Sequence, residues 1–114
     1  MKVINIRTGA LMLDNLDMAD NFYKRFKGLM GRKTLVKRTG LKIDPCNSIH
    51  CFFMRIPIDI MFLSKDDTVV KFIHDMKPWR VSPIVKGARY VIEANALEFA
   101  GKVELGDKLE FIEE

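Results

Sequence analysis

The residues best able to do chemistry gather in one stretch, residues 46–63, which reads CNSIHCFFMRIPIDIMFL. It is the most apolar part of the chain. It nevertheless holds both cysteines and one of the two histidines, His50. Arg55 and Asp59 lie among its large hydrophobic residues. A functional site, if the chain has one, is therefore expected around this stretch.

Cys46, His50 and Cys51 are residue types that bind zinc, but their spacing argues against a metal site. In an extended strand each residue advances about 3.3 Å, which places Cys46 and His50 roughly 13 Å apart. His50 and Cys51 would point to opposite faces. We therefore expect buried thiols, with no metal and no cofactor. A nucleophilic cysteine assisted by His50 or His74 is the enzymatic alternative.

Two carboxylates lie in apolar surroundings. Asp59 stands between two isoleucines, and Glu93 ends an apolar run. Such carboxylates have shifted pKa values and can serve as general acid and base. A small hydrolase-like enzyme using Asp59 and Glu93, or a cysteine, is therefore one alternative function. We favour a structural role, in which Asp59 pairs with Arg55 or accepts backbone hydrogen bonds where Pro57 interrupts the strand ladder.

Our first prediction is a binding module with a cleft beside the central strand, residues 49–63. His50 and Met54 share one face of an extended strand, and this face would form a mainly apolar side of the cleft that carries one polar group. The long loop 76–88 carries Trp79, a plausible exposed contact. The ligand is an unknown small molecule or a protein partner. The predicted ligand-binding residues are His50, Met54, Arg55, Asp59, Trp79 and Glu93.

A basic segment offers a third function. Residues 21–43 carry eight basic residues and no acid, whereas the whole chain is only +4, so the remainder carries −4. This uneven distribution of charge would attract an anion to the basic segment. The predicted anion-binding residues are Lys24, Arg25, Lys27, Arg32 and Lys33. A basic nucleic-acid accessory protein is the second alternative, although no recognised nucleic-acid motif is present.

Length and composition indicate a single domain over residues 1–114. The longest apolar run, residues 49–63, is too short and too interrupted for a membrane span, which needs about 20 apolar residues. No secretory signal pattern is visible at the start. Two cysteines fit free thiols in a reducing compartment, so we expect a cytoplasmic protein.

The periodicity predicts a mainly β fold of the α+β class. We expect a small barrel-like or folded-over antiparallel or mixed sheet of seven to nine short strands. One amphipathic helix is predicted over about residues 20–30, with Asp20 as its N-cap. The composition of about residues 94–100 is compatible with a second short helix.

Several motifs together resemble a known family. The segments GLMGR at 28–32 and IHCFFMRIPIDIMFL at 49–63 are similar to blocks of the domain of unknown function 192 family, also called uncharacterised protein family 0127. The resemblance implies a small, mostly β domain with no established activity, so it carries over no functional role. The chain departs from the family pattern at 67–68 and at 94–96, which suggests differently shaped loops there. The positions that match the family motif are Gly28, Met30, His50, Met54, Pro57, Asp59, Glu93, Gly106 and Asp107.

Overall fold

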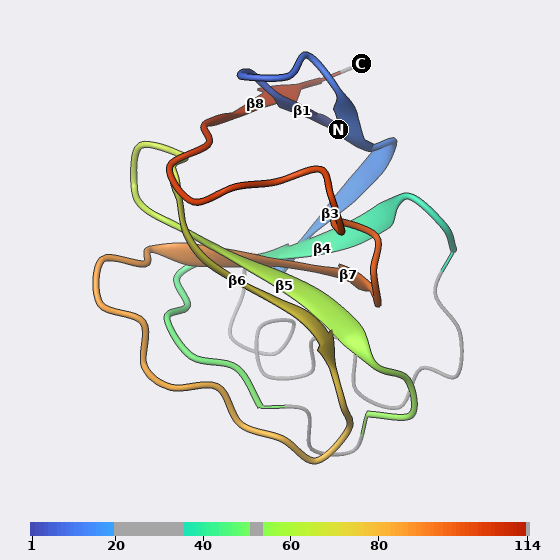
Figure 1. Cartoon of the computed structure of the whole chain (residues 1–114), viewed down its shortest axis with the longest axis vertical. Coiled ribbons are helices and arrows are strands. Elements are labelled where there is room, and N and C mark those ends of the chain that lie inside the picture. The colour runs from blue at the N-terminus through green and yellow to red at the C-terminus, as the bar shows by residue number, and fades with distance from the viewer. Residues whose placement is uncertain (20–35, 51–53, 114) are drawn as a thin grey trace.

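The chain folds into two β-sheets (Figure 1). The computed structural model describes residues 1–19, 36–50 and 54–113. The strands are β1 (Lys2–Asn5), β2 (Leu11–Leu13), β3 (Asn15–Ala19), β4 (Thr39–Ile43), β5 (Ile58–Leu63), β6 (Val69–Met76), β7 (Tyr90–Asn95) and β8 (Leu109–Ile112).

The smaller sheet has the order β2-β1-β8 and the larger sheet the order β3-β4-β7-β5-β6. All pairs are antiparallel except β3 with β4. The sheets are joined at two places. At the first, the Leu16 N–H donates to Met1 O at 2.8 Å. At the second, the N–H groups of Val69, Gly106 and Leu109 donate to Asp107 O, Val69 O and Asp67 O at 2.7, 2.8 and 3.0 Å, around a single bridge between Thr68 and Lys108. These contacts do not extend into ladders, so the sheets remain two separate layers and do not close into a barrel.

The predicted α+β, barrel-like class is therefore wrong. The described residues form an all-β fold, and none of them lies in a helix. The predicted helix over about 20–30 lies outside the described residues. The predicted helix over about 94–100 is replaced by the end of β7 and by turns. Asp59 accepts the N–H groups of Leu97 and Phe99, and Leu97 has a φ of 66°, so this segment is held in a conformation that a right-handed helix excludes.

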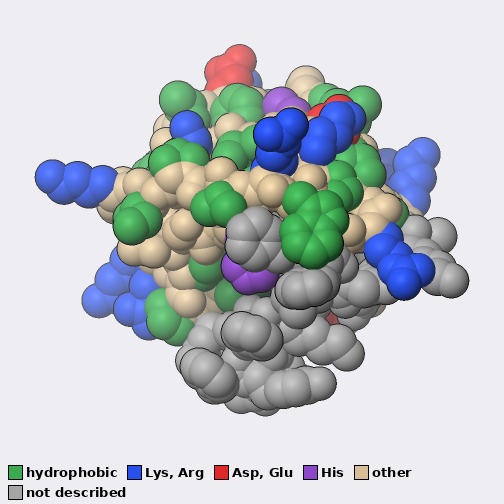
Figure 2. All heavy atoms as spheres, turned by 90° about the horizontal axis from the view of Figure 1, so that it is seen from below, with side chains coloured by type: hydrophobic (Ala, Val, Ile, Leu, Met, Phe, Trp, Pro, Cys, Tyr) green, Lys and Arg blue, Asp and Glu red, His purple; other side chains and the backbone are tan. Residues whose placement is uncertain are grey.

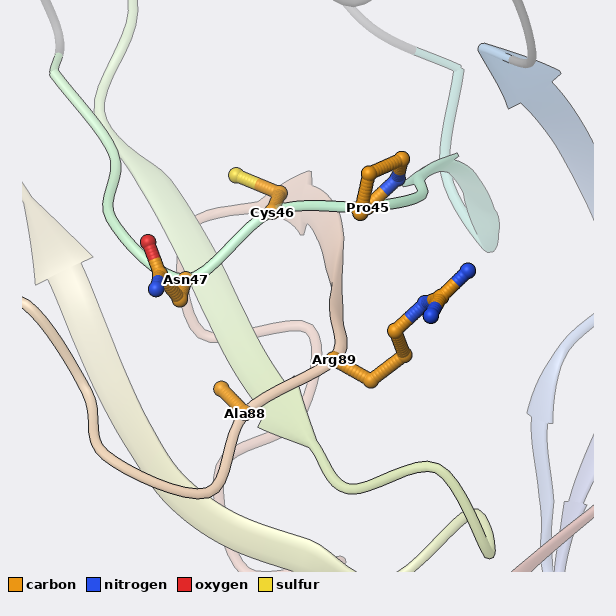
Figure 3. A pocket seen from close by; sticks show the side chains of 5 residues that line it. All are labelled: Pro45, Cys46, Asn47, Ala88 and Arg89. Atoms are coloured by element: carbon orange, nitrogen blue, oxygen red, sulfur yellow. The ribbon is translucent and has the colours of Figure 1, made fainter.

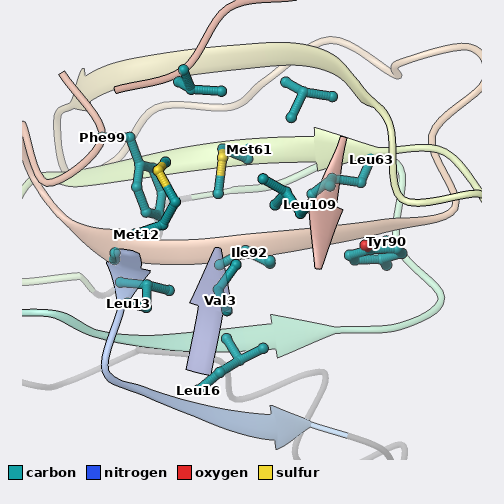
Figure 4. Close-up of a cluster of buried hydrophobic side chains, with 13 residues drawn as sticks. Val3, Met12, Leu13, Leu16, Met61, Leu63, Tyr90, Ile92, Phe99 and Leu109 are labelled. Carbon is teal, nitrogen blue, oxygen red and sulfur yellow. The ribbon is translucent and has the colours of Figure 1, made fainter. Parts of the chain in front are cut away.

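The larger sheet is the middle layer of the molecule, because both of its faces are covered. Every residue of β5 is buried, as are the first five residues of β7. One core fills the space between the two sheets and includes Val3, Met61, Ile92 and Phe99 (Figure 4). A second core covers the opposite face. There, side chains from irregular segments, including Ile49, Met54 and Val85, pack on β4, β5 and β7.

A close approach of strands explains the glycine at position 40. A Cβ atom there would lie 2.7 Å from Leu13 Cδ1 and 2.9 Å from the carbonyl oxygen of Glu93. Both distances are shorter than van der Waals contact. Gly40 therefore lets β4 pack closely under β2 and beside β7.

A buried carboxylate stabilises one end of the smaller sheet, where β1 ends and β8 begins. Asp107 accepts hydrogen bonds from Asn5 Nδ2 at 2.8 Å, Arg7 Nε at 2.5 Å and the Glu104 N–H at 2.8 Å. Arg7 is the main reason that the pKa of Asp107 lies well below its usual range. This cluster fixes the turn before β8 against the end of β1.

Candidate functional site

Two loops run side by side at the lower end of the molecule in Figure 1, and we call residues 44–50 and 77–89 the loop surface. Their backbones are paired in antiparallel fashion. Ile49 and Val85 anchor the loops in the second core. The loops are therefore fixed by hydrogen bonds and by packing. The pairs are Cys46 N–H to Arg89 O at 2.8 Å, Val85 N–H to Asn47 O at 2.8 Å, Ser82 N–H to Ile49 O at 2.7 Å, and a single bridge between His50 and Val81.

Three large apolar side chains project from this surface. Trp79 is 59% exposed, Val81 60% and Ile84 76%, and all three fall within six residues of one another. Trp79 also has a φ of 66°, a conformation that costs a bulky residue about 1–2 kcal/mol. Residues held in such conformations are concentrated at functional sites. Exposed apolar side chains on a rigid backbone are typical of contact surfaces.

The longer loop of the loop surface carries only basic charges. Residues 77–89 include four basic residues, Lys77, Arg80, Lys86 and Arg89, and no acidic one. Lys77 pairs with Asp75 at 2.6 Å, and Arg89 pairs with Asp44 at 2.9 Å. Figure 2 looks onto this end of the molecule and shows hydrophobic side chains with Lys and Arg around them, while Asp and Glu are visible mainly along one edge.

A shallow pocket of about 300 Å³ lies at one end of the loop surface (Figure 3). It is lined by Pro45, Cys46, Asn47, Ala88 and Arg89. Burial raises the pKa of the Cys46 thiol, and the charge of Glu93 adds to the rise. In Figure 3 the thiol and the Arg89 guanidinium point away from each other, so the guanidinium does not favour a thiolate. Cys46 is therefore a weak nucleophile at neutral pH.

The two carboxylates of the predicted acid–base pair lie on opposite faces of the larger sheet. Asp59 pairs with Ala94, whose side chain belongs to the core between the sheets. Glu93 pairs with Ile60, whose side chain belongs to the second core. Residues paired across a sheet share a face and neighbours along a strand do not. The sheet itself therefore separates Asp59 from Glu93, and they share no reacting position.

Asp59 is completely buried, and its hydrogen bonds serve the fold. Its Oδ1 accepts the Asp75 N–H at 2.8 Å and the Leu97 N–H at 2.7 Å. Its Oδ2 accepts the Phe99 N–H at 3.0 Å and lies 3.0 Å from His74 Nδ1. The carboxylate thus holds a bulge in β6 and the turn after β7 in place. Acceptance of backbone hydrogen bonds was the structural role favoured from the sequence, although the side-chain partner is His74 and not Arg55.

Glu93 is buried in the second core, and loss of contact with water raises its pKa to about 7. A carboxyl with this pKa could exchange a proton near neutral pH. However, the side chains of Ile60, Leu41 and Val91 on the same face are apolar. We therefore treat Glu93 as a buried acid of the core.

The structure places the other predicted site residues in different environments. His50 and Trp79 both belong to the loop surface. Met54 is buried in the second core, and Arg55 is exposed beside it in the chain. Cys51 and the predicted anion-binding residues Lys24, Arg25, Lys27, Arg32 and Lys33 lie outside the described residues.

The sequence prediction missed Val81, Ile84 and Lys86 as members of a surface. One signal in the sequence does point to them, which is the run of four basic residues without an acid over 77–89, interleaved with apolar residues. Over residues 1–19, 36–50 and 54–113, no group of three or more His, Cys, Asp and Glu residues is placed to hold a metal ion. The same residues include no helix long and apolar enough to cross a membrane.

Comparison with known proteins gives a consistent family match. Residues 3–111 match the model of the family described as DUF192, "Uncharacterized ACR". The UPF0127 protein of Pyrococcus furiosus is 36% identical over 113 residues, which cover 96% of this chain and 97% of that protein. A second UPF0127 protein, from Pyrococcus abyssi, is 37% identical over 114 residues with the same coverage. These matches confirm the resemblance found in the sequence.

Two crystal structures share the fold. A protein from Sinorhizobium meliloti, described as a "putative transcription regulator", superposes with a TM-score of 0.82 at 24% identity, covering 96% of this chain and 89% of that one. A protein of unknown function from Novosphingobium aromaticivorans gives a TM-score of 0.81 at 24% identity, covering 96% and 82%. At this level of identity the likeness shows the fold alone.

Proposed function

From the premise that the chain belongs to the DUF192 family, whose description names no activity, we propose that it is a binding module and that the loop surface is its contact site. One observation carries the proposal: Trp79, Val81 and Ile84 are exposed together on loops whose backbones are hydrogen-bonded and anchored in the core. A rigid surface loses little conformational entropy on binding, and a tryptophan is a frequent source of binding energy.

The shape of the loop surface favours a polypeptide over a small molecule. The pocket at Cys46 has a volume of only about 300 Å³ and lies at one end of the loop surface. It is too small and too open to enclose a ligand of ordinary size. The exposed apolar side chains Trp79, Val81 and Ile84 instead lie outside this pocket, in one segment of the loop surface. The free thiol of Cys46 fits a reducing compartment, which supports placing this binding module in the cytoplasm.

The alternative functions find less support in the geometry. An enzyme using Asp59 and Glu93 would need both groups near one reacting position, and they lie on opposite faces of a sheet. A nucleic-acid surface would combine its basic residues with groups that stack on bases or hydrogen-bond to them. Trp79 can stack on a base, but Val81 and Ile84 can neither stack nor hydrogen-bond, so their exposure favours a protein partner.

A selection with a random peptide library displayed on phage tests the proposal. The immobilised wild-type protein is compared with a Trp79→Ser/Ile84→Ser double variant. The matched control is Leu105→Ser, because Leu105 is 65% exposed and lies outside the loop surface. Circular dichroism of each protein confirms that it is folded before selection.

We expect peptides that bind the wild type and the Leu105→Ser variant but lose at least about tenfold in affinity for the double variant, since removal of a buried interface anchor costs about 2 kcal/mol or more. Two results would refute the proposal. One is a selection that enriches no peptide on the wild type. The other is a set of peptides that binds the double variant equally well.

A further inference from the structure

The charge of the loop surface identifies the class of partner. Resting on the function proposed above, we infer that the loop surface recognises an acidic peptide segment with interspersed apolar side chains. The apolar side chains would contact Trp79, Val81 and Ile84, and the carboxylates would pair with Arg80 and Lys86.

The loop surface keeps two basic charges that are not paired within the described part of the chain. Two of the four basic residues of 77–89 are already neutralised, Lys77 by Asp75 and Arg89 by Asp44. Arg80 and Lys86 are exposed, and neither forms an ion pair with any residue in the described part of the chain. Their charges are therefore available to a partner, and no acidic side chain within 77–89 competes for them.

These two basic residues are close in the sequence to the exposed apolar residues. Arg80 directly follows Trp79, and Lys86 lies two residues after Ile84. Each charge thus lies within two residues of an exposed apolar side chain. A partner that buries the apolar groups would bring its own charges near Arg80 and Lys86. Carboxylates there gain attraction, whereas lysines would be repelled.

The apolar contacts and the ion pairs contribute differently to the free energy of binding. Exposed ion pairs contribute about 0.2–1 kcal/mol each, so two pairs give roughly a twofold to thirtyfold preference. The apolar contacts therefore supply most of the affinity, and the charges decide which apolar peptide is chosen. Because salt screens exposed charges beyond about 10 Å at 0.1 M, the preference must shrink at high ionic strength.

A second copy of the chain is a less suitable occupant. The C-terminal segment 109–113 is both apolar and acidic in sequence. However, β8 is already paired along its length with β1, Lys2 with Ile112 through Asn5 with Leu109. Phe111 packs against the core between the sheets. To dock on another copy, this segment would have to leave its own sheet.

Three fluorescein-labelled peptides test the inference by fluorescence anisotropy. All carry the same leucine and phenylalanine residues, separated by glutamate in the first, glutamine in the second and lysine in the third. Titrations at low and high ionic strength use the wild type, an Arg80→Glu/Lys86→Glu double variant and a Lys108→Glu control. Lys108 is exposed and lies in the bridge to Thr68, away from the loop surface.

At low ionic strength we expect the glutamate peptide to bind the wild type and the Lys108→Glu control about tenfold more tightly than the glutamine peptide, with a smaller ratio at high salt. The Arg80→Glu/Lys86→Glu variant should reverse the order and prefer the lysine peptide. Equal binding of all three peptides to the wild type would overturn the inference and leave the proposed function standing. Failure of every peptide, together with an unproductive library selection, would overturn both.

Two further measurements test whether a second copy of the chain or a nucleic acid binds the loop surface in place of an acidic peptide. Sedimentation velocity over a range of protein concentrations detects self-association. A labelled single-stranded oligonucleotide in the same anisotropy assay detects nucleic-acid binding. Self-association, or oligonucleotide binding stronger than that of the glutamate peptide, would overturn the inference if the Arg80→Glu/Lys86→Glu variant abolished it.

Discussion

Replacing Asp59 by asparagine tests whether this buried carboxylate serves the fold. Asparagine has nearly the same volume, so it creates no cavity. It has only one acceptor oxygen, and its NH₂ group would face hydrogen-bond donors. Each Asp59 oxygen has two partners, three of the four being backbone N–H groups. With the NH₂ group at the Oδ1 position, the Asp75 and Leu97 N–H groups both lose their acceptor. With the NH₂ group at the Oδ2 position, the Phe99 N–H loses its acceptor, while His74 Nδ1 can accept from the NH₂ group in its other tautomer.

The expected cost follows from the one or two backbone donors that lose their acceptor. A buried donor left unsatisfied costs about 1–3 kcal/mol, so Asp59→Asn should lower the free energy of unfolding by about 1–6 kcal/mol, according to the orientation of the amide. This is a large part of the roughly 5–15 kcal/mol that stabilises a typical domain. His74→Ala removes a single partner and should cost only about 1 kcal/mol.

Urea unfolding followed by circular dichroism measures these differences. Asp17→Asn is the matched control, because Asp17 is exposed on the edge strand β3, and it should stay within about 0.5 kcal/mol of the wild type. A graded order, with the wild type and Asp17→Asn most stable, then His74→Ala, then Asp59→Asn, supports the structural role. If Asp59→Asn were as stable as Asp17→Asn, the reasoning would be wrong and a functional role for Asp59 would have to be reconsidered.

Three other substitutions test the remaining packing and charge arguments. As the pH rises from about 4.5 to about 7, the free energy of unfolding of the wild type should fall by roughly 3 kcal/mol, because Glu93 ionises at lower pH in the unfolded chain than in the folded protein. In urea titrations the Glu93→Gln variant should not show this fall. Gly40→Ala should lower the free energy of unfolding by about 1–3 kcal/mol, since its Cβ would meet Leu13 and a backbone carbonyl, and an unchanged melting temperature would contradict this. Asp107→Asn should be destabilising above about pH 4, and the difference from the wild type should shrink as acid protonates Asp107, because its folded pKa is depressed; a difference independent of pH would refute the assigned role of its charge.

The sequence predicted only part of the central strand. The predicted strand 49–63 is shorter in the structure, because β5 spans Ile58–Leu63 and residues 54–57 lie in no strand. Within 58–63, which is apolar at every position except Asp59, β5 is buried throughout. An aspartate in such a run must have its hydrogen bonds satisfied inside the protein, and backbone N–H groups satisfy them.

The parts of the site that depend on strand register could not be predicted. Asp59 and Glu93 both lie in apolar runs of the sequence, but a shift of one residue in register decides which face of the sheet each side chain takes. The segment 94–100 has helix-forming residues, yet the distant Asp59 carboxylate decides its conformation. Such long-range contacts override local propensity, and a single sequence contains no direct record of them.

The pairing of β1 with β8 affects how the protein can be synthesised. Lys2 lies opposite Ile112, and Leu109 lies in the same core as Val3. On a ribosome, β1 can pair with β2 early, but its other neighbour, β8, emerges only after β2 to β7 have been made. Contacts between residues so distant in sequence are associated with slow folding, and until they form, the apolar face of the larger sheet is exposed to water and to other nascent chains. The same proximity allows residues 2 and 112 to be joined by a short linker and new ends to be opened elsewhere, so a circular permutant that keeps β1 and β8 contiguous should fold faster than the natural order.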